Sequence, residues 1–219
     1  IRPLRIAFDD IKTFDSYNKA IRMSAEAGLK EFSNYLLYNF MDQPIDLYKR
    51  LRINVELCDE LNVNIYSFPM KYHPIRKGKC DDDDYSHNRD YIGKHWNRKY
   101  IRAVQAILNS TKGKIGRGMS FFLEAFGSTE DEYFELLEMP ETFILYRFFF
   151  KWLDEKGSMG TDHWRTCWCH CMRTLDEVEK QNVLDIIHRN VFSQEEIDTV
   201  TSEDALTLLN FYTNYRKDI

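Results

Sequence analysis

Apolar residues in the segment 31–75 follow two different periods. Short apolar and aromatic runs occupy Glu31–Pro44 and Leu61–Ile75, and each run ends abruptly in polar residues and a proline. That pattern is typical of buried parallel strands whose carboxyl ends open into loops. Between them, apolar residues recur mostly every three or four positions from Ile45 to Leu61, which predicts a helix. The segment therefore predicts a βαβ unit.

A third apolar run precedes this unit. Leu4–Phe8 is closed by Asp9 and Asp10, and a helix predicted to reach Ala27 is followed by Gly28, which tolerates left-handed backbone geometry. In a parallel barrel the carboxyl ends of the strands face the active site, so both carboxylates are candidates for ligand contacts. The alternative is that either carboxylate only begins a loop or caps a helix.

The three runs resemble consecutive strands of one enzyme family. Tyr35-Leu-Leu-Tyr-Asn-Phe-Met-Asp-Gln-Pro44 looks like the fifth strand and following loop of radical S-adenosylmethionine (radical SAM) enzymes. Tyr66-Ser-Phe-Pro-Met-Lys-Tyr72 resembles the sixth strand of the same barrel, and Ile6-Ala-Phe-Asp-Asp10 resembles the fourth. The resemblance implies an α/β fold in which residues 1–75 form the C-terminal half of a partial TIM-type (β/α) barrel, with about three parallel strands. Residues 76–95 are then a charged loop or linker, and residues 96–219 a mostly α-helical extension.

The resemblance also implies a chemistry and a set of site residues. Radical SAM enzymes cleave S-adenosylmethionine reductively at a 4Fe-4S cluster and so start radical chemistry on a substrate, which is unknown here. By position, Asp9 and Asp10 would contact the ribose, and Asn39 and Asp42 would lie near the adenine or the methionine. The end of the sixth strand would be lined by Met70, Lys71 and Tyr72. Tyr72 and the following His73 would face the substrate side.

One motif of the family is missing. The Cys-x-x-x-Cys-x-x-Cys loop that holds the iron–sulfur cluster follows the first strand in the family, and it occurs nowhere in this sequence. The chain opens at Ile1, with no Met, just before the run that resembles strand four. We therefore expect a fragment of a longer enzyme, whose missing N-terminal half-barrel is supplied in cis or in trans. Three parallel strands alone leave an open edge that must pair with something.

A basic region favours a different class of function. Between Arg89 and Arg117 there are eight Lys or Arg residues and a single acid, Asp90. The glycine-rich turn Lys112–Gly118 leads into a predicted helix, and such a turn can bind an anion through backbone N–H groups and the helix dipole, which makes Lys114 and Arg117 candidates. The alternative function is a non-catalytic module that contacts an anionic ligand, a nucleic acid or a protein partner through this region. The competing structural interpretation is a packed helix–turn–helix with an exposed basic side.

A cysteine cluster is the most distinctive local chemistry. In Cys167-Trp-Cys-His-Cys171, thiolates at every second residue point to one side if the segment is extended, and Cys167, Cys169, Cys171 and His170 are then candidate ligands for zinc or an accessory iron–sulfur cluster. The spacing is tighter than that of common zinc sites. The alternative is three thiols packed as small apolar groups in a helix beside Trp164 and Trp168.

Composition narrows the class of protein. With 43% hydrophobic and 30% charged residues, the 219-residue chain has the make-up of a globular protein with a real core. The net charge of −5 argues against a general nucleic-acid binder. The sequence holds no run of about eighteen apolar residues, so we expect no membrane span. Five cysteines, three of them within five residues, do not fit a secreted disulfide framework, and we expect a cytoplasmic protein.

Overall fold

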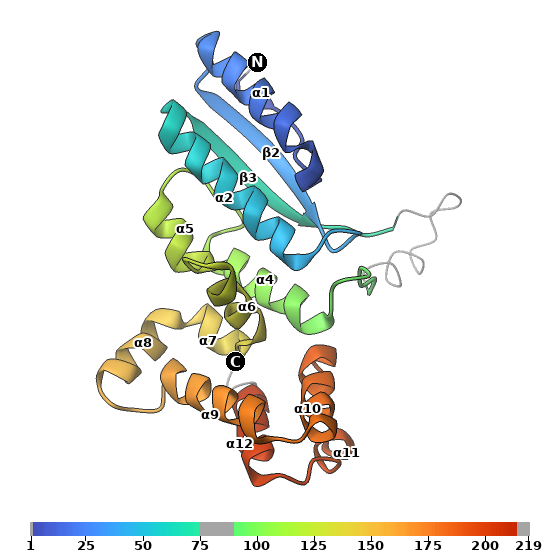
Figure 1. The fold of residues 1–219 in the computed structure, drawn as a ribbon. Coiled ribbons are helices and arrows are strands. Elements are labelled where there is room, and N and C mark those ends of the chain that lie inside the picture. The colour runs from blue at the N-terminus through green and yellow to red at the C-terminus, as the bar shows by residue number, and fades with distance from the viewer. Residues whose placement is uncertain (1, 75–89, 214–219) are drawn as a thin grey trace. The chain divides into compact units, whose positions relative to one another are not determined.

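The computed structural model describes residues 2–74 and 90–213 (Figure 1). Within it the chain divides into two compact units. The first unit contains residues 1–96 and 110–134, and the second contains residues 97–109 and 135–219. Of the predicted linker 76–95, residues 76–89 lie outside the described residues.

The first unit is built on a parallel sheet. The strands β1 (Leu4–Arg5), β2 (Glu31–Tyr38) and β3 (Asn64–Lys71) lie in the order β1-β2-β3, and both neighbouring pairs are parallel. A short 3-10 helix η1 (Ile11–Thr13) and the helix α1 (Phe14–Glu26) connect β1 to β2, and α2 (Pro44–Leu61) connects β2 to β3. This is the βαβ unit that the apolar periods predicted, extended by one strand at its amino-terminal side.

Helix α2 begins and ends where its local sequence favours it. Pro44 occupies the first turn, where its missing N–H costs nothing. The side chain of Asp46 accepts a hydrogen bond from the backbone N–H of Gln43 (2.8 Å), which is half of a capping box. The helix ends at Asn62, whose backbone is left-handed (φ 49°). Its buried stripe, which packs on the sheet, includes Leu47, Leu51, Val55 and Cys58.

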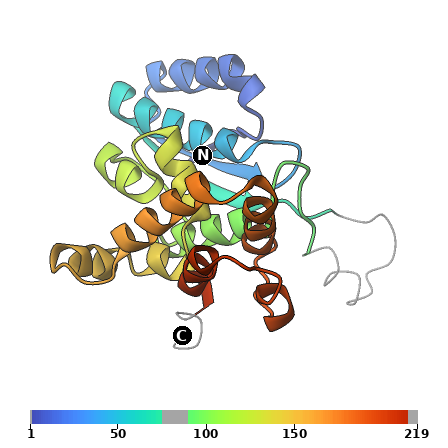
Figure 2. The same cartoon turned by 60° about the horizontal axis from the view of Figure 1, so that its bottom comes forward.

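Both crossover helices cover the same face of the sheet, as the two views in Figures 1 and 2 show. A buried chain of hydrogen bonds joins them to it. Asn34 of β2 donates to the hydroxyl of Tyr17, which donates to Asn54 of α2, and Asn54 donates to the hydroxyl of Ser67 of β3, each at 2.8 Å. Since side chains alternate along a strand, the face that carries Asn34 and Ser67 is the covered one.

The opposite face of the sheet is the exposed face, which we define by four residues of β2 and β3: Tyr35, Leu37, Phe68 and Met70. Tyr35, in the middle of β2, is 49% exposed, and Met70, in the carboxyl half of β3, is 46% exposed. The rings of Tyr35 and Phe68 contact each other at a centroid distance of 5.9 Å. The exposed face is therefore aromatic and apolar.

The rest of the first unit packs against α2 and the outer edge of β3. Ile115 forms an isolated antiparallel bridge to Ser67, with N–O distances of 2.7 and 2.9 Å. Helix α5 (Met119–Phe126) packs on α2, where the ring of Phe122 lies 5.4 Å from that of Tyr48. Helix α6 (Glu130–Glu138) begins in this unit and ends in the second one.

All regular secondary structure in the described residues of the second unit is helical. It contains α4 (Arg98–Ser110, up to residue 109) and the helices that follow α6. These are α7 (Glu141–Leu145), α8 (Arg147–Glu155), α9 (Thr161–Thr174), α10 (Glu177–Arg189), α11 (Gln194–Ile197) and α12 (Glu203–Thr213). Helices α9 and α12 pack together, and the buried indole of Trp164 donates to the hydroxyl of Tyr212 (3.2 Å).

The predicted fold class is confirmed at the level of an α/β protein with three parallel strands followed by a mostly helical remainder. The three strands form an open sheet, and the described residues contain no closed barrel. The first strand is shorter than the predicted Leu4–Phe8, because only Leu4 and Arg5 pair as a strand with β2. Within the described ranges, none of the helices combines the length and the apolar character that a membrane crossing requires.

Candidate functional site

Polar residues gather where the three parallel strands end. Asp9 and Asp10 follow β1, residues 39–42 follow β2, and Tyr72 and His73 follow β3. Because the carboxyl ends of parallel strands lie along one edge, this edge is the place where a ligand of an α/β protein is expected. It is the candidate functional site.

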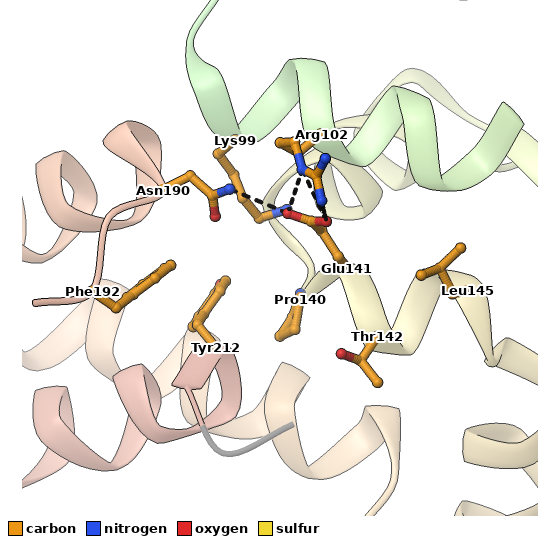
Figure 3. Close-up of a pocket in the computed structure, with 9 residues that line it drawn as sticks. All are labelled: Lys99, Arg102, Pro140, Glu141, Thr142, Leu145, Asn190, Phe192 and Tyr212. Carbon is orange, nitrogen blue, oxygen red and sulfur yellow. Dashed lines mark hydrogen bonds and ion pairs between the residues drawn. The ribbon is translucent and has the colours of Figure 1, made fainter. Parts of the chain in front are cut away.

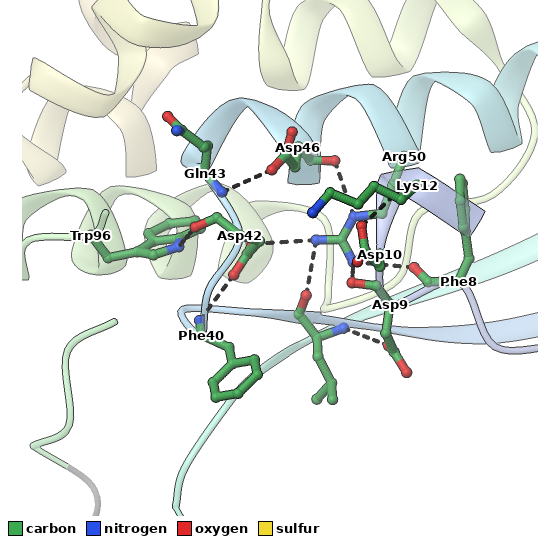
Figure 4. Close-up of polar contacts among 11 residues, drawn as sticks. Phe8, Asp9, Asp10, Lys12, Phe40, Asp42, Gln43, Asp46, Arg50 and Trp96 are labelled. Atoms are coloured by element: carbon green, nitrogen blue, oxygen red, sulfur yellow. Dashed lines mark hydrogen bonds and ion pairs between the residues drawn. The ribbon is translucent and has the colours of Figure 1, made fainter. Parts of the chain in front are cut away.

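A buried arginine holds this edge together (Figure 4). Arg50 of α2 has no exposed surface. Its guanidinium donates to the carbonyl oxygens of Phe8 (3.1 Å), Asp9 (2.8 Å) and Leu37 (2.9 Å), and through Nε to that of Asp46 (3.1 Å). One side chain thus fixes the segment after β1, the end of β2 and the first turn of α2.

The same guanidinium pairs with a carboxylate in the loop after β2. Arg50 lies 3.3 Å from Oδ2 of Asp42, whose Oδ1 accepts the backbone N–H of Phe40 (2.9 Å). Burial raises the pKa of Asp42, and the Phe40 N–H and the Arg50 charge oppose that rise. Burial lowers the pKa of Arg50, although nearby carboxylates oppose it. The pair is therefore a structural clamp of the loop, with its charges already satisfied inside the protein.

The two aspartates after β1 take different positions. Oδ1 of Asp9 accepts the backbone N–H of Leu37 (3.0 Å), so Asp9 ties β1 to β2 while its side chain stays exposed. Oδ1 of Asp10 accepts the backbone N–H of Lys12 (2.9 Å) and caps η1. Asp10 therefore caps a helix, which is the alternative considered from the sequence, whereas Asp9 presents a carboxylate at the strand edge.

Asn39 is a structural residue rather than an exposed ligand. It is fully buried, with a left-handed backbone (φ 70°). Its side-chain oxygen accepts the N–H of Gly93 (2.8 Å), and its amide donates to the carbonyl oxygens of Tyr91 (3.1 Å) and Tyr72 (3.4 Å). A Cβ atom on Gly93 would lie 2.5 Å from the carbonyl oxygen of Phe40, so the close approach of the two segments requires glycine.

Residues 91–96 complete this edge, and the sequence patterns did not predict them there. The indole of Trp96 donates to the carbonyl oxygen of Asp42 (3.0 Å) and its ring lies 5.4 Å from that of Tyr38. The ring of Tyr72 contacts Phe40 (4.5 Å) on one side and Tyr91 (5.6 Å) on the other. The only local signal is an aromatic residue and a glycine at 91–93 directly before a helix, which is too common to place a segment at a strand edge.

The residues at the end of β3 point to opposite faces. By alternation along the strand, Met70 lies on the exposed face and Lys71 on the helix-covered face. Tyr72 is partly buried between aromatic rings, and His73 is exposed. The exposed Phe40 (46%) and Met41 (58%) extend the apolar surface beyond the end of β2. The structure thus brings Asp9, Asp42, Met70 and Tyr72 to one edge but commits Asp42 to the interior.

The predicted anion site lies elsewhere. Lys114 places its ammonium 4.6 Å from the ring centroid of Tyr66, and Arg117 bonds to Asp59 (3.2 Å) and Asn62 (2.8 Å). Tyr66 and Asn62 lie near the amino-terminal end of β3, opposite to the edge that carries Asp9. Lys114 and Arg117 are therefore not part of the strand-end site.

The basic side of the preceding helix is exposed only in part. Lys99 has no exposed area and donates to the carbonyl oxygens of Leu137 (2.9 Å) and Met139 (2.5 Å). Arg102 forms an ion pair with Glu141 (2.7 Å). The prediction of an exposed basic face on this helix is wrong for Lys99, because its charge serves the carbonyl groups at the end of α6. Arg89 lies outside the described residues.

The cysteine segment is helical, which turns Cys169 away from the other two thiols. In α9, Cys167 and Cys171 are one turn apart, and both sulfurs lie near the carbonyl oxygen of Asp204 (3.9 and 3.4 Å), whereas Cys169 is exposed. Burial raises the pKa of Cys171 to about 12, so it is a thiol and not a thiolate at neutral pH. His170 contacts Oδ2 of Asp204 (3.1 Å). Over residues 2–74 and 90–213, no three His, Cys, Asp or Glu side chains are grouped as a metal site would require.

Comparisons of this chain with protein-family models, with curated proteins and with solved structures found no significant match. The likeness to radical SAM enzymes therefore rests on the strand motifs and their order in the chain. The structure shows two further features of the first unit, the strand edge held by Arg50 and the apolar exposed face of the sheet.

Proposed function

We propose that this chain is the C-terminal half-barrel of a radical SAM enzyme, followed by a helical extension, and that its strand edge forms part of the S-adenosylmethionine site. The observation that supports the proposal best is the exposed face of the sheet. Parallel sheets are almost always covered on both faces. Here α1 and α2 cover one face, while Tyr35 and Met70 on the other are about half exposed.

A closed βα barrel accounts for that arrangement. Its helices form an outer ring, and the opposite face of the sheet lines the interior. In this proposal the exposed face is the inner wall of the barrel, and β1, which is an edge strand of only Leu4–Arg5, pairs on its outer side with strands of the missing half. That half is present in cis or in trans.

The proposed roles follow the observed positions. Asp9, exposed at the strand edge, is the best-placed carboxylate for the ribose hydroxyl groups of S-adenosylmethionine. Phe40 and Met41 offer an apolar surface for the adenine, and Tyr72 lies on the substrate side. Asn39, Asp42 and Arg50 shape the edge without contacting the ligand.

The described residues do not fit a 4Fe-4S cluster. Such a cluster needs converging thiolates. The helical Cys167–Cys171 segment turns Cys169 away from the other two sulfurs, and burial keeps Cys171 protonated. The cluster and its ligands would have to come from the other half-barrel, so we derive no reaction step through it.

The test is made on the native protein, whatever its length, purified without oxygen. We expect an intact mass larger than that of this chain, iron and sulfide in the preparation, and formation of 5′-deoxyadenosine from S-adenosylmethionine after reduction. A native protein without iron that yields no 5′-deoxyadenosine refutes the proposal.

Equilibrium dialysis of S-adenosylmethionine tests the role of Asp9 separately. Asp9→Asn keeps an acceptor for the Leu37 N–H but removes the charge, so we expect a loss of affinity of about tenfold. Asp15→Asn, an exposed carboxylate in the first turn of α1, is the matched control and should bind as the wild type does. Equal affinity of both variants removes Asp9 from the site.

The second candidate function is a binding module for an anionic ligand or a nucleic acid. It is supported by the exposed side chains of Lys114 and Arg117 beside the amino-terminal end of α5, which has no side-chain cap. Replacing both residues with Ala should weaken binding to heparin or pyrophosphate and lower its salt dependence. Unchanged binding of both probes rules this function out.

A further inference from the structure

The helical second unit contains a cavity of its own. Its volume is about 330 Å³, within the range of about 300–1,000 Å³ typical of small-molecule pockets (Figure 3). Helix α4 contributes Lys99 and Arg102, the turn before α7 contributes Pro140 and Glu141, and the segment after α10 contributes Asn190. All its lining residues belong to the second unit.

A second hollow of about 260 Å³ adjoins the cavity and shares Arg102, Glu141 and Leu145 with it. The Arg102–Glu141 ion pair therefore stands between the two hollows. Amide side chains lie on both sides of it, with Asn190 in the cavity and Asn109 in the second hollow. The two hollows thus share a charged wall, and we call them together the groove.

The charges of the groove do not cancel. Burial alone would raise the pKa of Glu141, but its hydrogen bonds and ion pair with Arg102 lower it overall, so it is an anion at neutral pH. Lys99 and Arg102 are cations, so the residues that line the cavity carry one more positive than negative charge. The Arg102 side chain is 50% exposed, so its guanidinium can turn towards a second anion without leaving the protein surface.

The other end of the cavity is apolar and flat. The rings of Phe192 and Tyr212 stack at 5.7 Å with an angle of 17° between their planes. Pro140 is buried beside them, and Figure 3 shows the two rings side by side, apart from the Arg102, Asn190 and Glu141 group. Tyr212 is held in place because its hydroxyl donates to the carbonyl oxygen of Glu138 (2.8 Å).

We infer that this groove binds a small organic anion with a planar apolar body, a carboxylate being the simplest case. The carboxylate accepts hydrogen bonds from Arg102 and from Asn190, whose amide donates to Glu141 (3.2 Å) in the structure. The planar body lies against the Phe192–Tyr212 rings. Arginine suits a carboxylate because its planar fork donates two parallel hydrogen bonds. Glu141 already occupies that fork at 2.7 and 3.1 Å, so the ligand competes with an internal carboxylate for Arg102.

Because of that competition, substitutions of Arg102 and of Glu141 should change the affinity for a ligand in opposite directions. The probe is 3-phenylpropionate, and its neutral amide, 3-phenylpropanamide, has the same shape without the charge. Binding to the full chain is measured by the shifts of backbone amide signals in ¹⁵N NMR spectra. We expect the acid, and not the amide, to shift signals of residues around the groove at concentrations up to about 10 mM.

Arg102→Gln should weaken binding of 3-phenylpropionate about tenfold, since a charge-assisted hydrogen-bond pair is lost. Glu141→Gln should strengthen it, because Arg102 is released from its internal partner. Arg165→Gln is the matched control, since Arg165 also forms a half-exposed ion pair with a glutamate in this unit (2.8 Å) but lines neither hollow. Its affinity should equal that of the wild type.

Three results would overturn the inference. One is the absence of groove shifts with the acid in the wild type. Another is equal binding of the acid and the amide. That comparison uses the wild-type protein, so it does not depend on whether a variant folds. The third is weaker binding in a Glu141→Gln variant whose circular dichroism spectrum matches that of the wild type.

Discussion

The Arg50 clamp makes the most specific prediction about the strand edge. Replacing Arg50 with Met keeps much of the side-chain volume and removes every donor. The variant leaves carbonyl oxygens of Phe8, of β2 and of α2 without their partner, and it leaves Asp42 as a largely buried carboxylate without its cation. We therefore expect the first unit to lose stability and its strand ends to separate.

The magnitude follows from the groups left behind. Breaking a buried ion pair by removing one partner costs about 3–5 kcal/mol. Each buried acceptor left unpaired costs about 1–3 kcal/mol, although water can reach some of the carbonyl oxygens once the side chain has changed. We expect a loss of about 3–5 kcal/mol, which is a large share of the roughly 5–15 kcal/mol that stabilises a typical domain. Asp42→Asn added to Arg50→Met should recover about 1–2 kcal/mol, because the orphaned charge is gone.

Urea unfolding followed by circular dichroism gives the free energy of unfolding, and hydrogen exchange at the Leu37 amide reports on the first unit alone. Leu37 donates to Asp9 at 3.0 Å, so its protection depends on the clamped edge. Arg52→Met is the control, because Arg52 lies in the same helix with a 40% exposed side chain, and it should cost about 1 kcal/mol or less. An Arg50→Met variant no less stable than Arg52→Met would refute the clamp.

Three further results are expected. Gly93→Ala should destabilise the first unit by at least about 2 kcal/mol, because its Cβ would lie 2.5 Å from a backbone carbonyl oxygen. Gly116→Ala, whose nearest contact would be 3.5 Å, should be tolerated. Equal melting temperatures of the two variants would contradict this expectation. The folded-state pKa of Glu141 is below its ordinary value of 4.5, so its contribution to stability is present above that value and lost as the pH falls below it. The stability difference between wild type and Glu141→Gln should therefore shrink between pH 7 and pH 3, and a difference that is constant in urea unfolding would exclude the effect. Iodoacetamide at pH 8 should modify the exposed Cys169 well before the buried Cys171, whose pKa is about 12; mass spectrometry that finds Cys171 modified first would show that α9 opens in solution.

Local patterns predicted those parts of the fold that depend on residues near each other in the chain. Strand β2, helix α2 and strand β3 follow from a change of apolar period between residues 31 and 75. The same holds for the end of α1, where the predicted Gly28 follows the helix with a left-handed backbone (φ 90°). These features need only neighbours within one or two turns, so the sequence is sufficient to determine them.

The tertiary structure alone decided the state of the polar residues. Arg50 has the sequence context of an ordinary helix-surface arginine, yet it is buried because the segment after β1 and the end of β2 bring three carbonyl oxygens around it. Lys99 stands in a run of basic residues and is buried because the end of α6, about forty positions away, needs a donor. In an extended segment the three cysteines would be possible ligands of one metal site, but the helix turns Cys169 away from Cys167 and Cys171. Charge and polarity are properties of a single residue, whereas its burial and hydrogen-bond partners depend on segments that are distant in sequence. The local spacing of apolar residues does not show which distant segments those are.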